Sequence, residues 1–196
     1  MLEPHTHTVN TPSPPRIAFQ GELGAFSEQV IHKVWGTNAV AVPAVTFHDA
    51  IARVTSGDTA YAVIPVENAI AGPVIPALAA LEAAAMHIRF CDETRIDVQL
   101  CLMAPNGATI ESLRESYSHP MALAQSQHFF AAHPLLHAVV HDDTAGAARD
   151  VAHWNDVTKA AIAAEPAAAR YGLKILARGV QDSQENWTRF VIIARS

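Results

Sequence analysis

The sequence has little positive charge, only two cysteines and no long apolar run, and each shortage argues against a class of protein. Its 13 lysines and arginines are dispersed among 19 acidic residues, so no basic stripe is available to neutralise a nucleic-acid backbone. Cys91 and Cys101 form no CxxC pair, which favours two buried free thiols over a disulfide. No stretch approaches the roughly 18 consecutive apolar residues of a membrane helix. We therefore expect no nucleic-acid partner and no membrane span.

Several common cofactor and catalytic motifs are also missing. The spacing of Gly21 and Gly24 is not the GxGxxG dinucleotide fingerprint, and neither a P-loop lysine nor a GxSxG nucleophile motif occurs. Among eleven histidines, His133, His137 and His141 are spaced by four, as metal ligands on one helix would be. The residues between them, however, favour the start of a strand, which would separate the three rings. We expect no metal site.

The first fourteen residues differ in composition from the rest. Residues 1–14 are polar and rich in proline, threonine and histidine, which predicts a disordered tail. They contain neither the basic region nor the apolar run of a signal peptide. We therefore expect a cytoplasmic protein. Half of the chain is hydrophobic and 16% is charged, which is enough apolar material for a packed core.

From residue 15 onward, strand-like and helix-like patterns alternate. The predicted strands cover residues 16–20, 39–42, 61–66, 115–118, 135–140 and 159–163. The predicted helices cover residues 25–35, 48–54, 74–84, 143–152 and 165–171, and a further helix begins at Pro120. Residues 88–103 have strand-like runs without a long helix, which predicts a crossing into a second unit. Two late strands, 173–177 and 190–194, are expected to return to the first unit.

This alternation predicts an α/β fold with parallel strand pairs. We expect two small α/β lobes with mixed, mostly parallel sheets around a central cleft, as in periplasmic binding proteins. Lobe 1 would comprise residues 15–95 plus 176–196, and lobe 2 residues 96–175.

Polar residues and glycines follow most of the predicted strands. In open α/β sheets, ligands bind beyond the carboxyl ends of the strands, and the helices that follow favour carboxylates at their N-termini. A pocket for a small organic acid would explain this pattern, and simple helix capping by Ser, Asp and Asn is the alternative. The segments concerned are Gly21 to Ser27, Glu67 to Ala69, Ser118 to Pro120, Asp143 to Gly146, and Ala164-Glu165.

Five ordered motifs resemble those of the prephenate dehydratase family. The most specific is Asn186-Trp187-Thr188-Arg189-Phe190, which enters an apolar strand. The others, in chain order, are Gly21 to Glu28, Ile64 to Asn68 with Gly72, Ser118-His119-Pro120 with Ala122 to Gln125, and Asp143 to Ala148 followed by Ala160 to Ala163. The resemblance covers residues 16 to 194. Four positions depart from the family pattern: Ala69, Ala71, Met121 and Ser126. These differences bear on which substrate is preferred and leave the Thr188-Arg189-Phe190 core of the motif intact.

The resemblance implies a lyase that removes carbon dioxide and water from prephenate, a dicarboxylate, to give phenylpyruvate in phenylalanine biosynthesis. Aromatisation drives this reaction, so no cofactor is expected. Thr188 would be the general acid, Arg189 would pair with the substrate side-chain carboxylate, and Phe190 would pack beside the site. The remaining substrate-binding candidates are Asn68, Ser118, His119, Gln125, Thr144, Phe26 and Glu67, the last more as a buried residue that organises its loop than as an acid.

Two other functions are consistent with the same residues. The same chemistry could act on arogenate, or the chain could be an inactive module that binds a small acid. The family commonly carries a phenylalanine-sensing ACT domain after the catalytic region. Because only six residues follow Phe190, we expect no such domain within this sequence. A homodimer is expected from the high apolar content of so small a chain.

Overall fold

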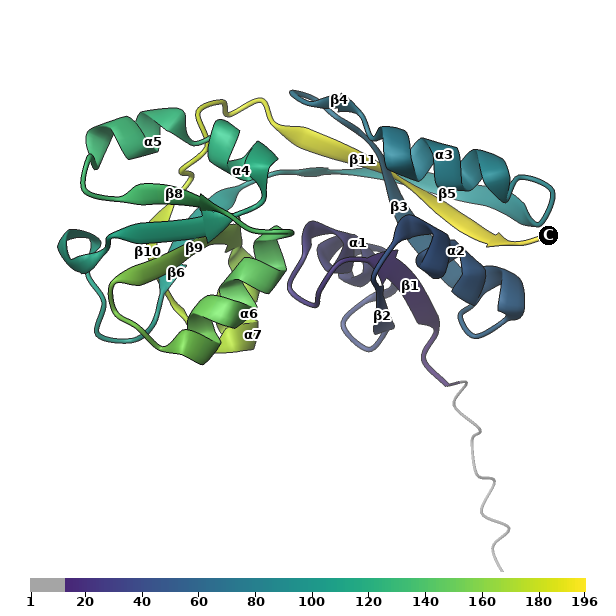
Figure 1. The fold of residues 1–196 in the computed structure, drawn as a ribbon. Coiled ribbons are helices and arrows are strands. Elements are labelled where there is room, and N and C mark those ends of the chain that lie inside the picture. Colours follow the sequence, from purple (N-terminus) through teal and green to yellow (C-terminus); the bar gives the residue numbers. More distant parts are fainter. Residues whose placement is uncertain (1–12) are drawn as a thin grey trace, which may run out of the picture.

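A computed structural model describes residues 13–196, which form two lobes, each built around one sheet (Figure 1). The predicted disordered tail, residues 1–14, lies almost entirely outside the described residues. The first sheet has six strands in the order β2-β1-β3-β11-β5, with β4 paired to β3, and the second has five in the order β10-β6-β9-β7-β8. The predicted α/β fold with two mixed sheets is confirmed.

The first lobe contains the N-terminal elements and the last strand. They are β1 (Arg16–Gln20), α1 (Phe26–Trp35), β2 (Val40–Ala44), α2 (Phe47–Ser56), β3 (Tyr61–Asn68), β4 (Gly72–Pro73), α3 (Ile75–Ala83), β5 (Ile88–Asp97) and β11 (Trp187–Arg195). Side chains alternate between the two faces of each strand, so Ile17 and Phe19 pack with α1 while Ala18 packs with α2 and α3. Both faces are therefore covered, as expected for near-continuous apolar strands.

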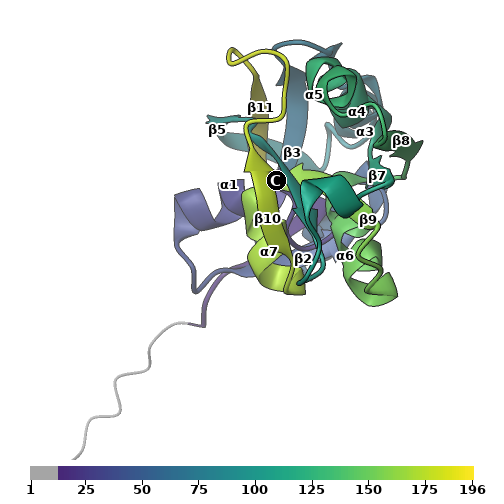
Figure 2. The ribbon, with the colours of Figure 1, turned by 90° about the vertical axis from the view of Figure 1, so that its left-hand side faces the viewer.

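The second lobe follows the crossing from β5. It contains β6 (Leu100–Ala104), a short 3-10 helix (Ile110–Ser112), β7 (Glu115–Ser118), α4 (Pro120–Ala124), α5 (Gln127–Ala132), β8 (His137–Val140), α6 (Thr144–Trp154), β9 (Lys159–Ala164), α7 (Glu165–Tyr171) and β10 (Lys174–Arg178). Figure 2 looks at this lobe from its end and shows α4 and α5 on one face of the sheet and α6 and α7 on the other. Three of its strands begin or end at residues that the sequence pattern predicted.

Two details of the predicted layout are wrong. The strand expected over residues 173–177 does not return to the first unit, because β10 pairs antiparallel with β6 in the second sheet. Antiparallel pairings also outnumber parallel ones, five against four, whereas mostly parallel sheets were expected. Three of the five antiparallel pairings involve the late strands β10 and β11: β10 lies at the edge of the second sheet beside β6, and β11 is inserted between β3 and β5 of the first. The return to the first lobe is made by β11 alone.

The two lobes touch directly beside the N-terminus of α1. The Tyr171 hydroxyl donates to the Leu23 carbonyl at 2.6 Å, and Arg149 bonds Glu22 at 2.6 Å. Gly24 lies so close to α7 that a Cβ at this position would be 3.0 Å from the Ala167 Cα. These contacts hold the α1 end of the first lobe against the helices of the second.

Two other expectations concern the thiols and the membrane. Cys91 and Cys101 are free, as predicted, although only Cys101 is fully buried. Within residues 13–196, no helix combines the length and apolar character that crossing a membrane would require.

Candidate active site

A cavity of about 520 Å³ lies between the lobes and collects most of the predicted site residues. The first lobe contributes the start of α1, the end of β3 and the start of β11. The second contributes the N-termini of α4 and α6. Seven of the ten candidate residues line this cavity, namely Phe26, Asn68, His119, Gln125, Thr144, Thr188 and Phe190. Residues from five separate sequence motifs therefore meet at one place.

Thr188 and Asn68 are neighbours on adjacent strands. They are directly opposite each other in the antiparallel pairing of β11 with β3, and the Asn68 Nδ2 donates to the Thr188 Oγ1 at 3.0 Å. The Asn68 Oδ1 accepts from the backbone N–H groups of Ile70 and Ala71, which closes a tight turn after β3. Since Thr188 Oγ1 is already an acceptor, its own proton is available for a group in the cavity.

The second lobe presents His119, Gln125 and Thr144. His119 caps α4, and its Nδ1 accepts from the Met121 N–H, which leaves Nε2 as the ring's other hydrogen-bonding nitrogen. Burial lowers the pKa of His119, with a smaller opposing effect from the Asp143 carboxylate, so the neutral ring is favoured. Thr144 begins α6, whose N-cap is Asp143. His119 and Thr144 reach the cavity because α4 begins just after β7 and α6 begins just after β8.

Three predicted site residues lie elsewhere, which corrects the sequence-based assignment. Arg189 was expected to pair with a substrate carboxylate. It lies on β11 between Thr188 and Phe190, so side-chain alternation turns it to the opposite face of the sheet. There its guanidinium bonds Glu67 at 3.0 Å and 3.1 Å and Glu93 at 3.2 Å.

Glu67 and Ser118 are likewise outside the cavity lining. Glu67 is hydrogen-bonded, as expected, but its side chain is 39% exposed and not buried. Ser118 is fully buried, and its hydroxyl donates to the Ile162 carbonyl at 2.5 Å, so it ties β7 to β9. A substrate-binding role for these two side chains is not supported by their positions.

Two residues at the site were not among the ten candidates, although both belong to motifs identified in the sequence. Asn186, only 2% exposed, donates from Nδ2 to Gln125 Oε1 at 2.8 Å and accepts from Asn68 at 3.0 Å. Asn186 lies two residues before Thr188 in the same motif, and this proximity could have identified it as a site residue from the sequence. Asp143 contributes a carboxylate to the cavity lining while its Oδ1 caps the Gly146 N–H. Its position directly before Thr144 would have pointed to it.

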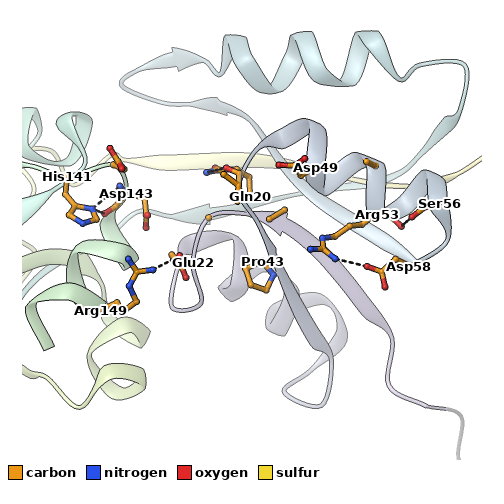
Figure 3. A pocket seen from close by; sticks show the side chains of 15 residues that line it. Gln20, Glu22, Pro43, Asp49, Arg53, Ser56, Asp58, His141, Asp143 and Arg149 are labelled. Atoms are coloured by element: carbon orange, nitrogen blue, oxygen red, sulfur yellow. Dashed lines mark hydrogen bonds and ion pairs between the residues drawn. The ribbon is translucent and has the colours of Figure 1, made fainter. Parts of the chain in front are cut away.

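A larger hollow of about 870 Å³, whose lining is drawn in Figure 3, shares Gln20, Gly21 and Asp143 with this cavity. Most of its charged groups are already paired. Arg149 bonds Glu22 and Arg53 bonds Asp58 at 2.8 Å, while His141 contacts the Asp143 backbone (Figure 3). None of the ten predicted site residues lines it, so the smaller cavity is the candidate active site despite its size.

In the described part of the chain, no three His, Cys, Asp or Glu side chains are grouped as ligands for a metal ion. His133 directly follows α5 and His137 begins strand β8, so neither shares a helix with His141, in agreement with the strand predicted here.

Comparison with known proteins gives a consistent result. The sequence model of the family described as "Prephenate dehydratase" matches residues 17–196. The chain is 40% identical over 190 residues to arogenate dehydratase/prephenate dehydratase 2, chloroplastic, of Arabidopsis thaliana, covering 97% of this chain and 49% of that protein. It is 37% identical over 182 residues to the bifunctional N-acyl-homoserine lactone acylase/prephenate dehydratase of Komagataeibacter europaeus, covering 91% and 62%.

A solved structure agrees with the fold. The prephenate dehydratase of Arthrobacter aurescens in complex with L-Phe superposes with a TM-score of 0.82 at 28% identity, covering 92% of this chain and 60% of that one. The chain spans about half the length of several curated relatives that it matches.

Proposed function

This chain belongs to the prephenate dehydratase family, and from that premise we propose that its cavity removes carbon dioxide and water from prephenate to give phenylpyruvate, a step towards phenylalanine. The observation that carries the proposal is the hydrogen bond from Asn68 to Thr188 at the cavity wall. It leaves the threonine proton free for the departing hydroxyl group. Thr188 is accordingly the proposed general acid, and the reaction is that of a carbon–oxygen lyase.

The difficult step is expulsion of hydroxide from the ring, because this leaving group needs a proton. A threonine hydroxyl is a weak acid, so its geometry and surroundings must compensate. The Asn68 N–H that points at Thr188 Oγ1 stabilises negative charge on this oxygen as its proton leaves. Loss of carbon dioxide supplies the electron pair that replaces the broken carbon–oxygen bond, and the ring becomes aromatic without a cofactor.

The substrate carboxylates must be held by uncharged donors, because no lysine or arginine from residues 13–196 lines the cavity. The first N–H groups of α1 have no side-chain cap and adjoin the cavity at Phe26, and the side chains of Gln125 and His119 add further donors. The ring carboxylate is the one that departs. We place it against the apolar rings of Phe26 and Phe190, because strong stabilisation of this anion would raise the barrier to its loss.

The test is Thr188→Val, which keeps the shape of the side chain and removes the hydroxyl. We expect kcat for phenylpyruvate formation to fall by about 10²- to 10⁴-fold, with an unchanged melting temperature. Thr188→Ser, which retains a hydroxyl, should keep part of the activity. Wild-type turnover in the valine variant would remove Thr188 from the acid role.

Arogenate is the second candidate substrate, and Asp143 is the observation that favours it. Arogenate carries an ammonium group where prephenate has a keto group. Asp143 lines the cavity, and its negative charge would attract this cation, while it would repel a dianion. Several relatives are named arogenate dehydratases, the Petunia hybrida enzyme among them, at 38% identity.

Comparing kcat/KM on the two substrates decides between them, and Asp143→Asn sharpens the comparison. Asparagine caps helices as well as aspartate does, so the fold should tolerate this change. If arogenate is the substrate, the variant should lose activity on arogenate selectively. If prephenate is the substrate, its KM should fall. Binding of either compound without turnover would favour the third reading, an inactive acid-binding module. A cytoplasmic location and a homodimer stay predictions.

A further inference from the structure

The buried amide of Asn186 joins two amides that line the cavity from different lobes. Its Oδ1 accepts from Asn68 of the first lobe at 3.0 Å, and its Nδ2 donates to Gln125 of the second at 2.8 Å. Asn186 itself is 2% exposed, does not line the cavity and lies directly before β11. It therefore contacts both walls of the site without being able to touch a ligand.

The orientation of these amides follows from the backbone. The N–H groups of Ile70 and Ala71 point at one end of the Asn68 side chain, at 3.1 Å and 2.9 Å. A backbone N–H can only donate, so that end must be the oxygen. The NH₂ end then faces Thr188, Asn186 and the Trp187 carbonyl, and this carbonyl can only accept.

The same logic passes from Asn68 through Asn186 to the second lobe. Because Asn68 donates, Asn186 must turn its oxygen towards it, and its NH₂ group then faces Gln125. The Gln125 atom that accepts this hydrogen bond must be Oε1. This leaves the Gln125 NH₂ group without a partner in residues 13–196, on a side chain that lines the cavity. Two backbone N–H groups thus determine the polarity of three side-chain amides.

We propose that Asn186 is a positioning residue that passes the orientation of Asn68 on to Gln125, so that both lobes offer hydrogen-bond donors to the cavity. The inference rests on the proposed function, since donors suit substrate carboxylates and a departing hydroxyl. On the first lobe, the orientation frees the Thr188 proton. On the second, it directs the Gln125 NH₂ group towards the ligand. Residues that touch no substrate therefore control which atoms the substrate meets.

The primary test is Asn186→Asp, which is isosteric and retains an acceptor for Asn68 but has no proton for Gln125. The Gln125 amide should flip so that its NH₂ group donates to the new carboxylate. The Gln125 oxygen then faces the substrate. We expect KM to rise about 10- to 100-fold. The effect on kcat should be smaller, because the backbone still holds Asn68. Lowering the pH protonates the new carboxyl, restores a donor for Gln125 and should bring KM back down.

Asn68→Asp should affect kcat more than KM, the opposite of what we expect for Asn186→Asp. A carboxylate beside Thr188 Oγ1 accepts the hydroxyl proton and withdraws it from the cavity, so kcat should fall much more than KM changes. The control is Gln181→Glu. Gln181 is 6% exposed and its Oε1 accepts from the Leu100 N–H at 2.9 Å, so the variant also buries a carboxyl but leaves the three amides untouched. Its KM should match the wild type.

A folded Asn186→Asp protein with wild-type KM, or with a loss that does not respond to pH, would overturn the proposal. If that variant does not fold, Gln125→Glu replaces it. In this variant one carboxylate oxygen still accepts from Asn186, and the other faces the cavity where the wild type has an NH₂ group. An unchanged KM in this variant would also overturn the proposal. Should the wild type act on neither substrate, the proposed function fails separately. Hydrogen exchange of the Gln125 side-chain NH₂ group, followed by NMR, then decides: a flipped amide would be hydrogen-bonded to the carboxylate that Asn186→Asp introduces and should exchange more slowly than in the wild type, and an unchanged rate would contradict the proposal.

Discussion

Replacing Gly24 with alanine would test whether the lobes are held at a fixed separation. Gly24 lies before α1 in the first lobe with φ of +95°, a conformation that residues with a Cβ rarely adopt. A Cβ at this position would lie 3.0 Å from the Cα and 3.1 Å from the Cβ of Ala167 in α7 of the second lobe. The Ala167 Cα belongs to a helix backbone and cannot rotate away, so the substitution must strain Gly24 or part the lobes.

The expected cost has two parts. The positive φ alone costs an alanine about 1–2 kcal/mol, and overpacking against a fixed neighbour costs about 1–3 kcal/mol. The free energy of unfolding should therefore fall by about 2–5 kcal/mol in urea denaturation. Parting of the lobes would also displace cavity walls, and a misplacement of about 1 Å can cost on the order of 10² in turnover.

Gly36→Ala is the matched control. Gly36 also has a positive φ, +81°, but an added Cβ would have no atom within 4 Å. It should show only the backbone part, about 1–3 kcal/mol, because φ +81° with ψ 171° is a conformation essentially confined to glycine, and turnover should be normal. The difference between the two variants isolates the contact between lobes. If Gly24→Ala destabilises the protein no more than Gly36→Ala does, the lobes are not in fixed contact at this point and the reasoning is refuted.

Three further outcomes can be measured. Arg189→Gln should lower the melting temperature, because Glu67 and Glu93 lose their partner, while KM for the substrate stays near the wild-type value; a large rise in KM at normal stability would return Arg189 to the substrate. Ser118→Ala should cost about 1–3 kcal/mol in urea, because a buried carbonyl of β9 loses its donor, without changing KM. Burial lowers the pKa of His119 below 6.5, so the folded state binds fewer protons than the unfolded state; stability present above pH 6.5 should fall as the pH drops towards the folded pKa, and His119→Gln should flatten this dependence.

Most of the strands and helices could be predicted from local patterns. The near-continuous apolar run of β3, the proline that opens α4 and the glycine that follows α7 each mark an element where the structure has one. The partner of β10 could not be predicted in this way. A short strand carries little information about its neighbour, and the pairing with β6 depends on how the whole chain packs.

The candidate site was predictable in so far as its residues belong to ordered motifs. Phe26, Asn68, Gln125 and Thr188 come from four such motifs and line one cavity. Arg189 belongs to the same motif as Thr188 and yet lies on the other face of the sheet. Motif membership therefore identified the segments that form the site, and not which of their side chains face it.

The sequence was enough to locate most strands and helices and the loops that carry polar groups, because these depend on spacing and residue type within a few positions. The direction of each side chain and the partner that it meets depend instead on how the whole chain packs. Arg189 is matched with Glu67 and Glu93 across strand pairs, and Asn186 reaches an amide 61 residues away. Such partners are brought together by burial and sheet register, which depend on the entire chain.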